Sequence, residues 1–220
     1  CLTTLDSRPP GDPQEDRLSA VEAHCQDLCK RMNVPCAVLE DRDVPARSIV
    51  KMAYYYDLLV MGARSFFHCD PNNEEDDTLR KVLAHSVTPV LCVPEVIPIG
   101  FEHACVIVDD SPDAARATRE FTNFASAYRP RISMVSSGDD SNCLAAVVRA
   151  TDYLKAHGFT DIAKPAHISD PIKAISENWF DDLDLVVTGR HSAHRWQELF
   201  HGNQAAELVR HAPAPVFVGL

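Results

Sequence analysis

An internal repeat constrains this chain more than any other feature of its sequence. The segment Asp57–Ser65 reads DLLVMGARS and matches Asp184–Ser192, which reads DLVVTGRHS, position for position. Further along, Val82–Val93 matches Leu208–Val218 apart from a slip of one residue, and both copies end in a helix, a proline and a strand. A repeat of this length and order indicates two related α/β units.

The second unit alternates strands with helices. Its apolar runs predict strands near residues 104–108, 131–135, 162–168, 183–189 and 216–218, and its periodic segments predict helices near 112–127, 142–157, 171–179 and 204–211. An apolar run that ends at a glycine, as at Gly189, is typical of a buried strand in a parallel sheet. The alternation therefore predicts a doubly wound sheet with helices on both faces.

The first unit is shorter. We expect strands near residues 1–5, 34–39, 57–61 and 89–93 and helices near 14–32, 46–55 and 78–85. No counterpart of the strand Val106–Val108 or of the helix after it is present, so the unit is truncated or its missing piece lies upstream of Cys1. Pro94–Gly100, with two prolines and a glycine, reads as the linker. The predicted domains are residues 1–97 and 98–220.

Composition narrows the class of function. A net charge of −11 argues against a nucleic-acid or anionic membrane surface, both of which need basic patches. No apolar run approaches the roughly 20 residues that span a bilayer, so we expect no direct membrane insertion. The eight cysteines are scattered, and Cys92 and Cys105 lie inside expected buried strands. This usage indicates free thiols and a reducing, cytoplasmic setting.

The repeat in the second unit also predicts an anion cradle. A loop follows the strand that ends at Gly189, and a helix is expected from Gln204 with Asn203 as its N-cap. A strand, a loop and a helix start together present backbone N–H groups to an anion. The corresponding loop of the first unit, between Ser65 and Thr78, carries five acidic residues, which would repel phosphate.

These segments resemble the universal stress protein family in its tandem two-domain form. The resemblance rests on the two strand-and-glycine copies, on the helix-Pro-Val endings, and on Val106–Ser111, which looks like that family's opening strand and turn. It implies an α/β fold of two tandem doubly wound domains, Rossmann-like and adenine nucleotide alpha hydrolase-like, with mainly parallel five-stranded sheets. The first domain lacks its opening strand and helix in this chain. The resemblance also implies an internal pseudo-dimer, in which Pro89–Val93 pairs with Pro215–Val218; a homodimer is a further expectation.

Some members of that family bind ATP through a loop of Gly, two residues, Gly, nine residues, Gly, then Ser or Thr. Here Gly189 and Gly202 match the first and third glycines with the nine-residue spacer intact, whereas Ser192 and Asn203 replace the other two members. The resemblance implies that ATP or another adenine nucleotide, with or without Mg²⁺, is contacted by the following residues: Asp109 at the nucleoside, and Gly189, His191, Ser192, Gly202, Asn203 and Gln204 at the phosphates.

Asp110 opposes such binding. Two like charges about 4 Å apart repel by about 4 kcal/mol at an effective dielectric constant of 20. A metal ion, or Arg190 and His191 within reach, would offset this repulsion. The crowded histidines His191, His194 and His201 fit no metal-ligand spacing, and we interpret them as solvated loop residues.

Two functions stay open at this stage, beside an adenine-nucleotide-using enzyme on the same α/β scaffold, for which the fold alone supplies no chemistry. The first is a cytoplasmic, non-catalytic stress-response regulator that binds an adenine nucleotide in its second unit. The sequence shows no dedicated base, so any ATP hydrolysis would be slow. The second is a nucleotide-independent interaction module, such as the cytoplasmic part of a transporter, in which the degenerate loop is kept only for its turn. The sequence does not identify the protein partner.

Overall fold

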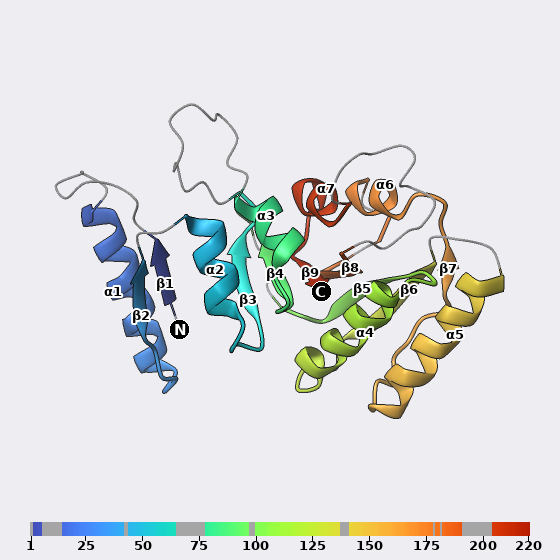
Figure 1. Cartoon of the computed structure of the whole chain (residues 1–220). Coiled ribbons are helices and arrows are strands. Elements are labelled where there is room, and N and C mark those ends of the chain that lie inside the picture. The colour runs from blue at the N-terminus through green and yellow to red at the C-terminus, as the bar shows by residue number, and fades with distance from the viewer. Residues whose placement is uncertain are drawn as a thin grey trace.

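The computed structural model describes residues 2–5, 15–41, 44–64, 78–96, 100–136, 141–177, 179–180, 182–190 and 204–220 of the 220-residue chain. Its strands form a seven-stranded sheet in the order β3-β4-β9-β8-β5-β6-β7 and a separate two-stranded sheet of β1 and β2. Figure 1 shows the larger sheet running through the molecule, with α4 and α5 on its lower face and α3, α6 and α7 on its upper face. The chain is therefore an α/β protein, as predicted.

The second half forms a complete five-stranded parallel unit. Its elements are β5 (His103–Val108), α4 (Pro112–Ala125), β6 (Arg131–Ser136), α5 (Ser141–Ala156), β7 (Ala166–His167), α6 (Pro171–Ser176), β8 (Leu185–Gly189), α7 (Gln204–His211) and β9 (Val216–Gly219). The strand β5 lies at the centre, parallel to β6 on one side and to β8 on the other. All six residues of β5 are buried, which agrees with the unbroken apolar run that predicted this strand.

Local signals set the helix starts in this half. The Ser111 side chain accepts a hydrogen bond from the Ala114 N–H at 3.1 Å and so caps α4, which begins at Pro112. The Asp170 side chain accepts one from the Lys173 N–H at 2.8 Å and caps α6. Such side-chain acceptors satisfy N–H groups that have no partner within the helix.

The first half is built of β1 (Leu2–Leu5), α1 (Glu15–Arg31), β2 (Val38–Asp41), α2 (Pro45–Ala53), β3 (Leu59–Gly62), α3 (Thr78–His85) and β4 (Val90–Val93). The strands β1 and β2 pair with each other in parallel, and β3 pairs with β4 in parallel. Among the described residues no strand joins these two pairs. The missing opening strand that the repeat predicts stays a prediction.

The two halves meet through their last strands. The strands β4 and β9 are antiparallel, with Val90 opposite Val218 and Cys92 opposite Val216. The predicted pairing of the closing strands is therefore confirmed, and it removes one exposed edge from each half. The proposed domain boundary at residue 97 and the tandem character of the chain stay predictions.

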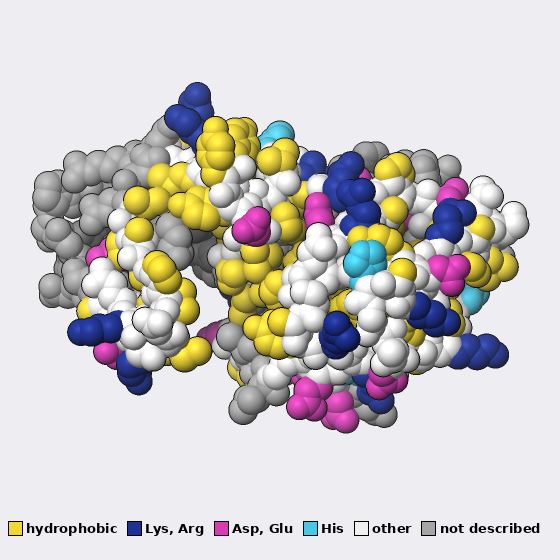
Figure 2. Space-filling model, turned by 90° about the horizontal axis from the view of Figure 1, so that it is seen from below, with side chains coloured by type: hydrophobic (Ala, Val, Ile, Leu, Met, Phe, Trp, Pro, Cys, Tyr) yellow, Lys and Arg dark blue, Asp and Glu magenta, His cyan; other side chains and the backbone are white. Residues whose placement is uncertain are grey.

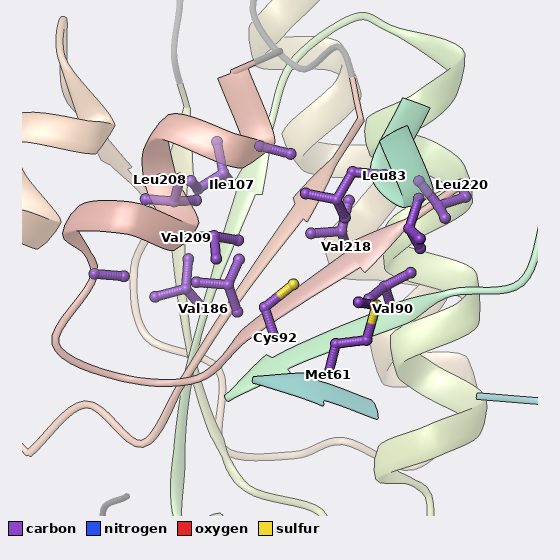
Figure 3. Packing of buried hydrophobic residues seen from close by; sticks show 14 of the residues in the cluster. Met61, Leu83, Val90, Cys92, Ile107, Val186, Leu208, Val209, Val218 and Leu220 are labelled. Atoms are coloured by element: carbon purple, nitrogen blue, oxygen red, sulfur yellow. The ribbon is translucent and has the colours of Figure 1, made fainter. Parts of the chain in front are cut away.

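The core above the sheet is shared by both halves. Figure 3 shows Met61 and Val90 from β3 and β4, together with Leu83 of α3, converging with Val209 of α7 and Val218 of β9. A second core lies below the sheet, where α4 and α5 cover β5, β6, β8 and β9. The helix α4 approaches β9 so closely that a Cβ added at Gly219 would overlap the backbone of Ala117.

The hydrophobic face expected on α1 is exposed in the structure rather than buried. The three- and four-residue spacings predict an apolar face, yet Val21, Leu28 and Met32 are 53%, 46% and 69% exposed. An apolar helix face is buried only where another element covers it. These three side chains stay exposed although α1 contacts the strand β1.

The aspartates that precede β3 and β8 predict a difference in stability between two matched variants. The Asp184 carboxylate accepts hydrogen bonds from the Glu102 and His103 N–H groups at 2.9 and 3.0 Å, whereas Asp57, at the same place in the repeat, is exposed and has no partner among the described residues. We expect Asp184→Ala to lower the free energy of unfolding by about 2 kcal/mol in urea denaturation. The matched Asp57→Ala variant should change it by less than about 0.5 kcal/mol. Equal losses in the two variants would contradict this assignment.

The buried cysteines predict a pattern of thiol reactivity. Burial raises the pKa of both the Cys92 and Cys105 thiols to about 12, from a usual value of 9.0. At pH 8 their thiolate fraction should therefore be roughly a thousandfold lower than that of an ordinary thiol. Mass-spectrometric mapping after brief alkylation should find the half-buried Cys25 and Cys29 modified and both strand cysteines intact. Rapid labelling of Cys92 or Cys105 in the folded chain would contradict the core described above.

Candidate functional site

The candidate site lies where the strand order reverses in the second half. From β5 the chain crosses to β6 on one side, and it later returns to β8 on the other. In open parallel sheets ligands bind in the crevice outside the carboxyl ends of the strands at such a switch point. Val106 pairs with Val187, so the turn after β5 and the end of β8 lie side by side. Asp109, after β5, and Gly189, at the end of β8, therefore lie at the same edge of the sheet.

Asp109 is held rigidly in the turn after β5. Its Oδ1 accepts a hydrogen bond from the Ser111 N–H at 2.8 Å, and the residue is 5% exposed. The same turn leads into the capped start of α4. Its buried carboxylate therefore has a fixed orientation at the edge of the crevice.

The charge of Asp110 is offset by a residue that the sequence did not indicate. The Arg149 Nη2 of α5 donates to Asp110 Oδ1 at 3.3 Å. The two residues are 39 positions apart in the chain. From the sequence, Arg149 is identified only as a residue of the helix expected near 142–157. Arg190, which the sequence suggested as one possible offset for this charge, donates its hydrogen bonds to carbonyl groups of the first half.

Arg190 connects the candidate site to the first half. Its Nη1 donates to the Ala84 carbonyl of α3 at 3.1 Å, and its Nη2 donates to the Ser86 carbonyl. These carbonyls lie at the end of α3, where helical C=O groups lack partners within the helix. Burial lowers the pKa of the Arg190 guanidinium, and Asp113 and Glu120 act in the opposite direction. Its Nε is buried and has no hydrogen-bond partner among the described residues.

A groove of about 360 Å³ opens next to the Asp109 turn, between α4 and α5. Alanines lie along it, at Ala115 on α4 and at Ala146 and Ala150 on α5, which leaves room between the helices. Its remaining polar lining includes Asp109, Ser111, Thr118, Arg119, Arg149 and Tyr153. This volume is within the range of small-molecule pockets. The three- and four-residue spacing of residues 146, 149, 150 and 153 was the available sequence signal for the α5 wall.

The structure describes only part of the predicted phosphate loop. Gly189 is buried at the end of β8 and pairs with Gly219 of β9. The helix α7 begins at Gln204, as predicted. His191, Ser192, Gly202 and Asn203 lie outside the described residues, as do His194 and His201 of the histidine-rich loop. Within the described ranges, no three His, Cys, Asp or Glu side chains are grouped to hold a metal ion.

Comparison with solved structures defines the class of fold. A universal stress protein from Archaeoglobus fulgidus DSM 4304 aligns with 98% of this chain and 84% of its own, at 17% identity and a TM-score of 0.66. A putative universal stress protein from Pseudomonas aeruginosa UCBPP-PA14 aligns with 99% of this chain and 81% of its own, at 14% identity and a TM-score of 0.57. A functionally unknown protein from Pseudomonas aeruginosa PAO1 has the same coverage and TM-score at 16% identity. No protein-family model matches the chain, and no curated protein matches it either.

The class is therefore the open, doubly wound α/β fold with its crevice at the β5/β8 switch point. Within that class, the chain has the fold of the universal stress proteins. The resemblance that the repeat and the turn after β5 predicted is confirmed at the level of the fold. Across the described residues, no helix is both long enough and apolar enough to cross a bilayer.

The contacts of Arg190 predict that its loss weakens the junction between the halves. Replacement by methionine keeps much of the side-chain volume but removes the charge-assisted hydrogen bonds to Ala84 and Ser86. We expect Arg190→Met to lower the free energy of unfolding by about 2 kcal/mol. The control is Arg64→Met, since Arg64 is 76% exposed and meets Glu95 only at 4.0 Å. Equal midpoints of urea denaturation for Arg190→Met and the parent chain would contradict this role.

Proposed function

We propose that the chain is a universal stress protein: a non-catalytic regulator of the stress response, acting in the cytoplasm, that binds ATP or another adenine nucleotide in its second half. The proposal is supported by the shared fold and by the glycine spacing after β8. The observation that carries it is the juxtaposition of the buried Asp109 and the end of β8 at the switch point of the sheet. This is the place where an α/β sheet of this kind accepts a ligand.

In this proposal the nucleoside lies against the turn after β5. The Asp109 carboxylate is an acceptor for ribose hydroxyl groups, because ionised carboxylates accept and do not donate. Its orientation is already fixed by the Ser111 N–H, so little ordering is required on binding. The adjoining groove between α4 and α5 supplies space beside the same residue.

The phosphates would lie between the end of β8 and the start of α7. The predicted contacts are made by the backbone and side chains of the residues after the strand, namely Gly189, His191, Ser192, Gly202, Asn203 and Gln204. The first N–H groups of α7 have no partner within the helix and carry partial positive charge, which favours an anion. A serine hydroxyl at residue 192 and an asparagine amide at residue 203 are both hydrogen-bond donors.

The negative charge of the chain opposes nucleotide binding, and one ion pair offsets part of this repulsion. The chain has a net charge of −11, and Asp110 lies next to the expected ligand. Arg149 lies 3.3 Å from Asp110 and reduces the local repulsion. Mg²⁺ bound with the nucleotide would neutralise more of the phosphate charge. Without a dedicated base, we expect ATP turnover to be slow, so that the bound nucleotide acts as a signal.

Calorimetry tests this proposal. Titration of the full chain with ATP and Mg²⁺ should give saturable binding of one nucleotide, and Gly202→Asp should weaken it more than tenfold by adding a negative charge to the phosphate loop. The matched control is Asn72→Asp, which adds the same charge to the acidic loop of the first half and should leave binding unchanged. Circular dichroism should show the same fold for both variants.

Two results would contradict the proposal. Undiminished binding by Gly202→Asp would move the nucleotide to another site. Absence of heat at millimolar ATP would favour the nucleotide-independent interaction module, in which the loop after β8 serves only as a turn.

A further inference from the structure

The groove between α4 and α5 extends well beyond the turn that holds Asp109. Arg119 lines it about two helical turns after Ser111, so this far end of the groove lies about 12 Å from the turn. Figure 1 shows α4 and α5 next to each other on the lower face of the sheet. Figure 2 views the molecule from that side and shows Lys and Arg side chains beside hydrophobic ones. The far end is therefore a distinct part of the groove.

The charged groups at the near end of the groove are matched within the chain. Arg149 of α5 meets the Asp110 carboxylate at 3.3 Å, and the Asp109 carboxylate accepts a hydrogen bond from the Ser111 N–H at 2.8 Å. Tyr153 follows Arg149 by one turn of α5 and so lies level with the far end.

The far end carries two hydrogen-bond donors that have no acceptor in the described part of the chain. Arg119 makes no hydrogen bond or ion pair there, because the carboxylate of the neighbouring Glu120 accepts from the Leu220 N–H at 3.1 Å. The Tyr153 ring lies against His157, with centroids 4.2 Å apart, and its hydroxyl makes no hydrogen bond to a described residue. A guanidinium only donates, and a phenol hydroxyl also donates well. The complement of this pair is an oxygen anion.

Small apolar side chains form the walls between the two ends. Pro112 and Ala115 belong to α4, and Ala146 and Ala150 belong to α5. These short side chains leave the volume of about 360 Å³, which suits a small ligand with an apolar body. Both walls are helices, so a rigid, flat body loses less conformational freedom on binding here than a flexible chain does.

We propose that the far end of this groove binds a small aromatic carboxylate. The carboxylate accepts hydrogen bonds from the Arg119 guanidinium and the Tyr153 hydroxyl, and the aromatic ring lies between Ala115 and Ala150. A guanidinium and a carboxylate form two parallel hydrogen bonds, which fixes the orientation of the ligand. This site is separate from the crevice at the end of β8, so the proposal does not depend on nucleotide binding.

The charge of the surroundings favours a carboxylate over a phosphate. Asp109 and Asp110 lie at the near end of the same groove, and the whole chain has a net charge of −11. Repulsion grows with the charge of the ligand, so a group with one negative charge is repelled less than a group with two.

Titration of the full chain with naphthalene-2-carboxylate, followed through amide chemical shifts, tests the proposal. We expect saturable shifts at Thr118 and Ala150, which line the groove from its two helices. Naphthalene-2-carboxamide has nearly the same shape and no charge. It should bind about tenfold more weakly or worse, because it forms no charge-assisted hydrogen bond with Arg119.

Three variants identify the groups that bind the probe. Arg119→Gln should weaken binding of the carboxylate about tenfold or more and leave binding of the carboxamide unchanged. The matched control is Arg47→Gln, because Arg47 is also an exposed arginine without a side-chain partner among the described residues. Ala115→Leu adds volume from an exposed position on the wall of the groove and should abolish binding of both probes. Circular dichroism should show the parent fold for all three variants.

Three results would overturn the proposal. The first is the absence of shifts at Thr118 and Ala150 at millimolar carboxylate, and the second is equal affinity of Arg119→Gln and Arg47→Gln for this probe. The third is loss of carboxylate binding when ATP and Mg²⁺ are added, which would assign the groove to the nucleotide. Carboxylate binding by a chain that gives no heat with ATP would support this site and contradict the nucleotide proposal.

Discussion

The antiparallel contact between β4 and β9 is the interaction on which the rest of the structure depends. Each of these strands would otherwise be the exposed edge of a short parallel sheet, and exposed edges are prone to pairing with other chains. The pairing places Val90 and Val218 opposite each other, both fully buried, and lets α3 and α7 cover one common apolar surface. Neither half buries this surface without the other, so the two halves share one core in spite of the internal repeat.

Among the described residues, the two halves differ in whether they form a switch-point crevice. A switch-point crevice needs a central strand with neighbours on both sides, and β5 provides it in the second half. The described part of the first half has no strand in that place, and therefore no counterpart of Asp109. The acidic residues between Ser65 and Thr78 are one reason to expect no phosphate binding in the first half. The strand order is a second, independent reason.

Local features of the sequence predicted much of this architecture. The helices Thr78–His85 and Gln204–His211 begin and end as expected, and Ser111 caps α4 as expected. The strand expected at Val34–Leu39 is instead Val38–Asp41, which pairs with β1 from Val38 opposite Leu2 to Asp41 opposite Leu5. The strand expected at residues 162–168 is reduced to Ala166–His167 and a single bridge at Ile162, on either side of Pro165, which has no N–H for a sheet.

The features that the sequence did not reveal depend on contacts between distant residues. The apolar spacing of α1 predicts a hydrophobic face but cannot indicate whether another element covers it. Likewise, the pairing of Arg149 with Asp110 joins residues 39 apart, and nothing in either local sequence specifies it. The direction of Arg190 depends on the place of α3, which is fixed only once β4 and β9 have met.

The hydrogen bonds from Arg190 to the end of α3 connect the two halves of the molecule. Arg190 directly follows the last residue of β8, and its guanidinium donates to the Ala84 and Ser86 carbonyls of the first half. A displacement of the Arg190 side chain would therefore either move the end of α3 or break these two hydrogen bonds. The Arg190 side chain thus ties the end of β8 directly to the end of α3.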